Sequence, residues 1–274
     1  MQTPSPAAPV AASPGSGRLL TGFAAGASVG LLGGMIGLGG AEFRLPLLIG
    51  IFGFAALQAV ILNKALSLVV VAAALPARLV AVPYTALAPH WTVVVNLLAG
   101  SLAGAWLGAT WATRMRSSTL YRVLAGLLVL ISVALAANHL GTVSAVGLDP
   151  LPRAIAGLAA GVGIGVVAAL MGVAGGELLI PTIMLLYGID IKLAGSLSLA
   201  VSLPTMLVAF ARYSRDASFT VLRTNARFAT VMAAGSVTGT LLGGLLLGLV
   251  PAAVLIPLLV ALLLASAVKV WRHE

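Results

Sequence analysis

Two copies of one glycine-rich motif, each carrying a glutamate and a proline, are the strongest candidates for a functional site. The first copy is GLGGAEFRLPLLIGIFG, from Gly37 to Gly53. The second is GVAGGELLIPTIMLLYG, from Gly172 to Gly188, and it begins 135 positions later. A glycine break that opens a short helix leaves backbone N–H groups free at the positive end of the helix dipole. Such a helix start binds anions, so each motif predicts part of an anion site. The glycines expected to contribute are Gly39, Gly40, Gly175 and Gly176.

A lysine in the next apolar stretch supplies a second candidate group. Lys64 lies within QAVILNKALSLVVVAAAL, and a buried ammonium costs several kcal/mol unless it is paired or lines a wet cavity. Asn63 and Ser67 lie four residues apart on one helix face, with Lys64 just beside it. We predict that these polar groups bind an oxyanion together with their counterparts in the second copy, Ser198 and Ser202.

The glutamates of the two motifs oppose this simple prediction, because an ionised carboxylate repels an anion. Three interpretations of Glu42 and Glu177 stay open. They form structural ion pairs with Lys64 or Arg44; they are neutral, because burial disfavours the charged form; or they carry protons in a coupled transport cycle. A carboxyl group that binds a proton together with the anion would remove the repulsion, and substrate affinity would then strengthen as the pH falls.

The two motifs belong to a longer internal duplication. At the same offset, GSLAGAWLG from Gly100 pairs with GSVTGTLLG from Gly235. A chance match would not keep its register over so long a stretch, so the chain consists of two related halves. Small residues spaced four apart line close helix contacts in membranes. The glycines expected to pack in this way are Gly104, Gly108, Gly239 and Gly243.

The composition indicates a membrane protein. The chain is 61% hydrophobic and 8% charged, whereas soluble domains carry about 25% charged residues. Apolar stretches of about 20 residues recur, as helices that cross a bilayer require, and the short alternating segments of a membrane barrel are absent. We therefore predict a polytopic α-helical membrane protein. Arginines in cytoplasmic loops explain its net charge of +9 better than nucleic-acid binding does.

Several kinds of chemistry are excluded or disfavoured by the sequence. The chain has no cysteine, and its histidines, His90, His139 and His273, lie far apart, so no metal site is expected. The HExxH motif of zinc hydrolases is absent, as is the phosphate-binding motif GxxxxGK[ST]. We therefore expect no enzyme activity, no cofactor and no ATP-driven step.

Ten apolar segments divide the chain into a tail and two membrane repeats. Residues 1–17 are predicted to be a disordered tail, 18–140 the first repeat, 141–152 a linker and 153–274 the second repeat. The second and seventh segments are shorter than the roughly 20 residues that a helix needs to cross a bilayer. The segments are approximately 19–39, 42–55, 57–82, 91–112, 118–138, 153–173, 177–189, 192–211, 228–249 and 252–269.

Loop charges predict that the two halves are inverted relative to each other. In the first half, arginines follow the fourth segment and are missing from the loop 84–90 before it; in the second half, they precede the equivalent segment. Because basic loops stay in the cytoplasm, equivalent loops lie on opposite sides. The predicted fold class is therefore two inverted-topology repeats of about five helical segments each, with both termini cytoplasmic. The arginines are Arg114, Arg116 and Arg122, then Arg212, Arg215, Arg223 and Arg227.

With its repeated glycine-rich motif, GLGG and GVAGG, the downstream prolines and the Asn63-Lys64 pair, the chain resembles the TauE/SafE sulfite exporter family, anion permeases of the 4-toluene sulfonate uptake type. The resemblance covers approximately residues 18–270. Two features depart from the family pattern. The second half carries Ser196-Leu197-Ser198 in place of Gly-Thr-Ser, and glutamates stand at both motif positions where the family commonly has aliphatic or small residues.

The resemblance implies a secondary transporter in the bacterial inner membrane that moves sulfite or sulfonates such as sulfoacetate, usually outward. Transport would proceed by alternating access at a site near the bilayer midplane. The expected partners are a small anion, membrane lipids and a coupling proton, with a homo-oligomer left open. A passive anion channel, or a permease for another small anion or organic acid, is the alternative.

Overall fold

The computed structural model describes residues 16–36, 40–81, 84–140, 146–246 and 252–272, and regular structure within these ranges is helical throughout. The first half contains α1 (Ser16–Ile36), α2 (Ala41–Gly50), α3 (Ala56–Ala81), α4 (Tyr84–Leu87), the 3-10 helix η1 (Ala88–His90), α5 (Trp91–Arg114) and α6 (Ser117–Leu140). The second half contains α7 (Pro150–Met171), α8 (Gly176–Tyr187), α9 (Ile191–Tyr213), η2 (Ala217–Phe219), α10 (Thr220–Thr224), α11 (Ala226–Leu245) and α12 (Ala252–Trp271).

Each of the ten predicted apolar segments coincides with a helix, which confirms the all-helical prediction. The short elements α4, η1, η2 and α10, which connect longer helices, were not predicted. Most of the predicted tail, residues 1–15, lies outside the described residues, and α1 begins at Ser16. Residues 141–145 of the predicted linker also lie outside them, and α7 begins at Pro150.

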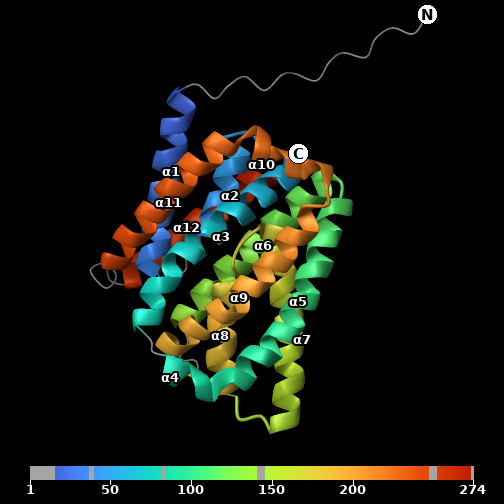
Figure 1. Ribbon diagram of the computed structural model, residues 1–274, viewed down its shortest axis with the longest axis vertical. Helices are drawn as coiled ribbons and strands as arrows, with labels where there is room; N and C mark the ends of the chain where they lie inside the picture. The colour runs from blue at the N-terminus through green and yellow to red at the C-terminus, as the bar shows by residue number, and fades with distance from the viewer. Residues whose placement is uncertain (1–15, 37–39, 82–83, 141–145, 247–251, 273–274) are drawn as a thin grey trace, which may run out of the picture.

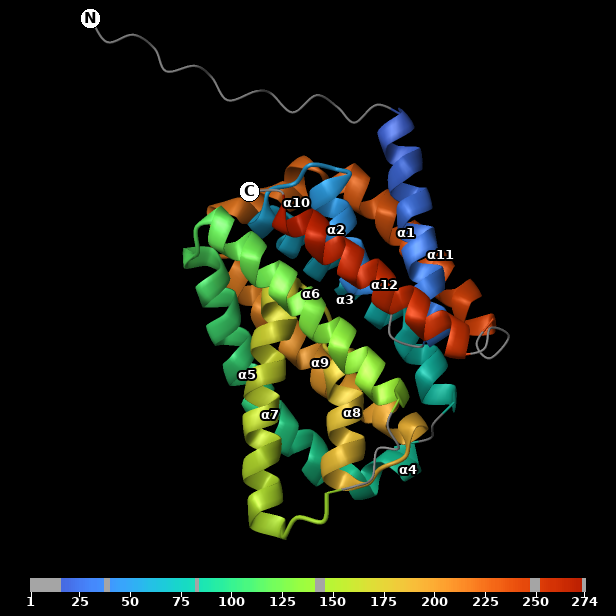
Figure 2. The same cartoon turned by 180° about the vertical axis from the view of Figure 1, so that it is seen from behind.

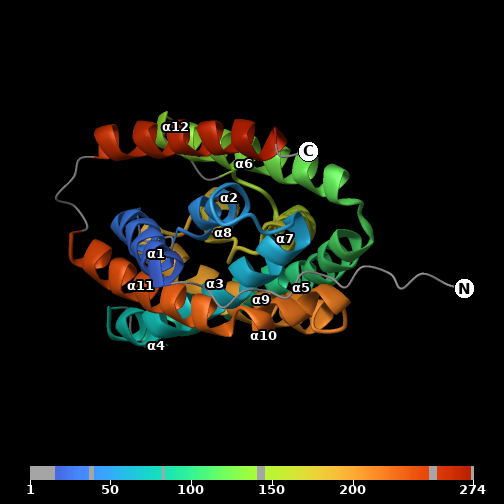
Figure 3. The same cartoon turned by 90° about the horizontal axis from the view of Figure 1, so that it is seen from above.

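The duplication is visible in the order and packing of the helices. The offset of 135 positions places α1 on α7, α2 on α8, α3 on α9, α5 on α11 and α6 on α12. Helix α1 packs along α11, and its counterpart α7 packs along α5; α3 contacts α9, and α6 contacts α12. Seen from above, α2 and α8 lie in the middle, and α6 and α12 run along one side (Figure 3). The main helix contacts therefore follow the duplication. The α1–α11 contact corresponds to the α7–α5 contact, and the α3–α9 and α6–α12 contacts each join two equivalent helices.

Equivalent elements lie at opposite ends of the long axis. Helix α4 lies at the lower end of the molecule in Figure 1, whereas the second-half connection that contains α10 lies at the upper end. Helix α1 starts at the upper end, and α7 starts at the lower end (Figure 2).

Six of the described helices are long and apolar enough to cross a membrane. They are Ala56–Ala73, Ala88–Arg114, Ser117–Ala136, Pro150–Met171, Lys192–Tyr213 and Ala226–Leu245. Helix α8 is apolar but shorter, and α2 has ten residues. The two segments that open at the glycine motifs are therefore short, as the sequence predicted.

Glycines bring paired helices into backbone contact. A Cβ atom added to Gly104 of α5 would meet the backbone carbonyl of Val162 on α7. The symmetric glycine, Gly239 of α11, approaches the carbonyl of Ala27 on α1 in the same way. The structure thus confirms close packing at these glycines, and the same contact is built twice.

Gly104→Ala is expected to destabilise the protein by about 1–3 kcal/mol, the usual cost of forcing extra atoms into a packed interface. The melting temperature of the detergent-purified protein should fall by several degrees. Gly163→Ala on α7 is the control, because a Cβ atom there meets nothing within 4 Å. Equal melting temperatures for the two variants would contradict the tight α5–α7 contact.

Candidate functional site

Glycines in the left-handed region start the two short helices. Helix α1 ends at Ile36 and α2 begins after Gly40, which has φ 68°; α8 begins after Gly175, with φ 85°. Glycine adopts these angles without the steric penalty of a Cβ atom. A Cβ atom at Gly40 would also collide with the carbonyl of Val29. Glycine at these positions therefore permits the predicted breaks. Gly176 is the first residue of α8, and Gly39 lies outside the described residues.

The first turns of α2 and α8 meet in the interior. Helix α2 lies in the upper half of the molecule and α8 in the lower half (Figure 1). Their first turns carry Glu42 and Glu177, whose carboxyl groups are close enough to interact electrostatically. Neither helix start is capped by the side chain of its N-cap residue. The carboxyl groups thus lie at the positive helix ends where the sequence predicted a substrate anion.

Both carboxyl groups are buried and receive little support from the rest of the protein. Glu42 is 1% exposed and Glu177 is 9% exposed. Glu42 Oε2 and both carboxyl oxygens of Glu177 accept no hydrogen bond from any other described group. Buried polar atoms normally have partners, so these oxygens mark a place where a proton, water or ligand is needed.

Arg44 is fully buried beside this pair and binds neutral acceptors. Its Nε donates to Asn63 Oδ1 at 2.8 Å, and its Nη2 donates to Ser67 Oγ at 2.7 Å. Nη1 donates to Ser236 Oγ on α11 at 3.2 Å. Arg44 attracts Glu42 electrostatically without forming an ion pair among the described residues. The guanidinium charge is therefore held in place but not neutralised by direct contact.

Lys64 is also fully buried, and it binds the end of α7. Its Nζ donates to Ala168 O at 2.8 Å and to Val173 O at 2.7 Å. A cation at a helix C-terminus stabilises the free carbonyl groups there. Lys64 attracts Glu177, but it forms no ion pair with either glutamate in the described part of the chain. Lys64 therefore stabilises the second glycine break through hydrogen bonds to backbone carbonyl groups. The sequence did not predict this contact.

Asn63 and Ser67 connect the two breaks to α3. Asn63 Nδ2 donates to Ala41 O and Met171 O, at 3.0 Å each. Ser67 Oγ lies 2.7 Å from Asn63 O and 3.1 Å from Gly172 O, and it accepts from Arg44. One face of α3 thus contacts both glycine breaks.

The second half lacks the matching cations. The offset places Leu179 at the position of Arg44 and Leu199 at that of Lys64. Ser198 Oγ donates to Gly195 O within its own helix, and Ser202 Oγ is buried without a partner. Each half therefore contributes one carboxyl group, and the first half contributes both cations.

Comparison with known proteins identifies the family. The family described as Sulfite exporter TauE/SafE matches the chain over residues 23–270. The chain belongs to the TauE/SafE family. No curated protein and no solved structure matches the chain.

Membership in the TauE/SafE family makes the chain a multi-pass membrane transporter for small anions and points away from an enzyme. Its buried ionisable groups fit this assignment. Charged side chains inside a membrane are rare and mark substrate or ion pathways. Broken helices whose starts meet near the midplane form the substrate sites of many secondary transporters.

Sequence reasoning did not single out Ser236, which contacts Arg44 of the candidate site. Ser236 accepts from Arg44, and its symmetric counterpart Ser101 lies 2.7 Å from Thr205 Oγ1. Ser101 and Ser236 are the second residues of the duplicated segments GSLAG and GSVTG. Their identity at equivalent positions was the available signal.

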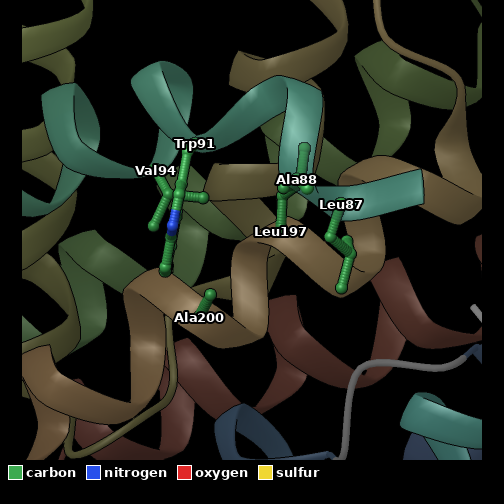
Figure 4. A pocket seen from close by; sticks show the side chains of 6 residues that line it. All are labelled: Leu87, Ala88, Trp91, Val94, Leu197 and Ala200. Carbon is green, nitrogen blue, oxygen red and sulfur yellow. The ribbon is translucent and has the colours of Figure 1, made fainter. Parts of the chain in front are cut away.

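A separate apolar pocket of about 150 Å³ lies between α4, η1, α5 and α9 (Figure 4). Its lining offers one polar group, the indole N–H of Trp91, and it includes none of the predicted site residues. The pocket therefore does not fit the anion of a TauE/SafE transporter. The residues that line it are Leu87, Ala88, Trp91, Val94, Leu197 and Ala200.

Proposed function

We propose that this protein is a secondary transporter that exports sulfite or sulfonates such as sulfoacetate by alternating access. The substrate site lies between the starts of α2 and α8, within reach of Arg44. The meeting of two positive helix ends beside a buried, unneutralised guanidinium carries the proposal. Free backbone N–H groups bind anions, and the planar guanidinium of arginine suits an oxyanion with several oxygens.

The roles of the surrounding residues follow from their contacts. Arg44 supplies the charge that attracts the anion, while Asn63 and Ser67 orient the guanidinium. Lys64 holds the second break in position and adds positive potential. Ser202, whose buried hydroxyl is unpartnered, is available as a further donor to the substrate.

The distribution of arginines supports an inverted repeat with both termini in the cytoplasm of a bacterial inner membrane. The start of α1, the turn between α5 and α6, the connection with α10 and the end of α12 lie at the same end of the molecule (Figures 1 and 2). Positively charged loops stay in the cytoplasm. The opposite end holds the starts of α7 and α9, which carry Arg153 and Lys192.

Residues 113–118 and 213–226 are expected to face the cytoplasm together. The natural chain has no cysteine, so single cysteines placed in these segments report without background. Both should resist an impermeant thiol reagent added outside intact cells and react after the membrane is permeabilised. A cysteine at Asp149, before α7, should react from outside. Labelling of only one arginine-rich segment in intact cells would contradict the inverted arrangement.

Reconstitution into liposomes tests the function itself. A carrier should take up labelled sulfonate or sulfite saturably, and substrate inside the vesicles should stimulate entry from outside. A thermal-shift screen with sulfite, thiosulfate, sulfate, sulfoacetate and taurine identifies the preferred anion. Flux that never saturates would favour the channel alternative, and the absence of flux for all these compounds would refute the proposed substrate class.

A further inference from the structure

The two carboxyl groups of the site face each other without a donor between them. Glu42 and Glu177 interact electrostatically with one another. Three of their four carboxyl oxygens lack a hydrogen-bond partner from the rest of the described protein. An ionised carboxylate only accepts hydrogen bonds. The contact between the two groups is therefore attractive when one of them carries a proton and repulsive when neither does.

The nearby cations donate no hydrogen bond to either carboxyl group. The charged groups that act on the pair are Arg44, from α2 itself, and Lys64, from α3. Helices α1 and α12 also pack against α2, and α6, α7 and α9 pack against α8. No other charged side chain of the described residues acts on either carboxyl group. Both cations are occupied by hydroxyl, amide or carbonyl oxygens.

The charges in the cluster set how many protons accompany an anion. With both carboxyl groups ionised, two cations and two carboxylates cancel. One proton on the pair leaves one net positive charge, and one monovalent anion then restores neutrality. Net charge is costly in a buried site of low dielectric. Neutral states are therefore favoured both with and without substrate.

We propose that Glu42 and Glu177 form a single proton-binding unit that takes up one proton with each monovalent oxyanion, so that the two cross the membrane together. This inference rests on the proposed function and narrows its substrates. The proton binds one carboxyl oxygen and is shared with the other carboxyl; it leaves when the anion is released. Sulfonates with a single charge and singly protonated sulfite satisfy the balance. Sulfate and sulfoacetate, with two charges, would need a second proton.

The proton count is measurable on the unaltered protein. Proteoliposomes should take up methanesulfonate, a monoanion across the working pH range, when a pH gradient is imposed at zero membrane potential. A pH-sensitive dye should record one proton for each anion. Because the bound state holds one proton more than the free state, the apparent Kd should rise about tenfold per pH unit on the alkaline side. A ratio of zero or two protons would overturn the inference.

Removing one carboxyl charge should uncouple transport. In Glu42→Gln or Glu177→Gln the cluster is positive without a proton, so the anion binds without one. Uptake should then follow the membrane potential, become insensitive to the pH gradient and show a flat pH profile of affinity. Asp149→Asn, an exposed acid before α7, is the control and should stay coupled. A ratio of one proton per anion in either Gln variant would refute the shared unit.

The transport measurements distinguish a failure of this inference from a failure of the proposed function. If the unaltered protein moves no methanesulfonate and no sulfite under any gradient, the proposed function is wrong. If it moves methanesulfonate saturably but without protons, only the proton-binding unit is wrong. The wild-type measurement decides between these outcomes even if a Gln variant fails to fold.

Discussion

Arg44→Gln should reduce sulfonate transport in proteoliposomes about a hundredfold. The guanidinium is fully buried and is fixed by Asn63, Ser67 and Ser236. Losing one partner of a buried, hydrogen-bonded charge pair costs about 2–5 kcal/mol in binding, and each 1.4 kcal/mol is roughly tenfold in affinity. Glutamine keeps an amide that can donate to one of these acceptors, so the fold should be retained.

The measurement is the initial rate of uptake over a range of substrate concentrations, with equal amounts of folded protein. Arg44→Lys keeps the charge but not the planar set of donors, so it should recover part of the activity. Arg116→Gln, at an exposed position in the turn between α5 and α6, removes the same charge away from the site. Wild-type kinetics in Arg44→Gln would show that the guanidinium does not attract the substrate.

Lys64→Met should both destabilise the protein and abolish transport. Its ammonium is the buried donor that satisfies Ala168 O and Val173 O at the second glycine break. A buried acceptor left without a donor costs about 1–3 kcal/mol, and two acceptors are affected here. Tryptophan fluorescence during heating should show a lower melting temperature. Lys192→Met removes an exposed ammonium from the start of α9 and should leave the melting temperature unchanged.

Binding to the folded fraction of Lys64→Met separates the two roles of this lysine. If the melting temperature falls and folded protein loses the sulfonate, the second break is needed to build the site. If stability is normal and binding is lost, Lys64 contacts the anion directly, as the sequence predicted. Normal stability together with normal binding would contradict both interpretations.

The short helices α2 and α8 show what could be predicted from sequence. A glycine that needs a positive φ, a downstream proline and a stretch too short to cross a bilayer are local properties, readable without tertiary contacts. Because the chain is duplicated at a constant offset, each of these properties occurs at equivalent positions in both halves. The number and approximate bounds of the long helices followed for the same reason, because hydropathy is a property of each segment alone.

The partners of the charged residues depended on tertiary structure. Sequence reasoning assigned the substrate cation to Lys64 and gave Arg44 a secondary place. The structure places Lys64 on carbonyl oxygens more than a hundred residues away and joins Arg44 to Ser236 on α11. No local pattern specifies such contacts, because they arise only when helices from both halves pack together.

Sequence by itself determined the membrane class, the two related halves, the glycine breaks and the candidate polar residues, since hydropathy, backbone conformation and internal repetition act over short distances along the chain. Tertiary structure alone decided that the carboxyl groups of Glu42 and Glu177 meet, that both cations come from the first half, and which acceptors hold them. The physical reason is that hydrogen bonds and charge interactions fall off within a few ångströms. They can be assigned only when the folded chain has brought distant segments within that range.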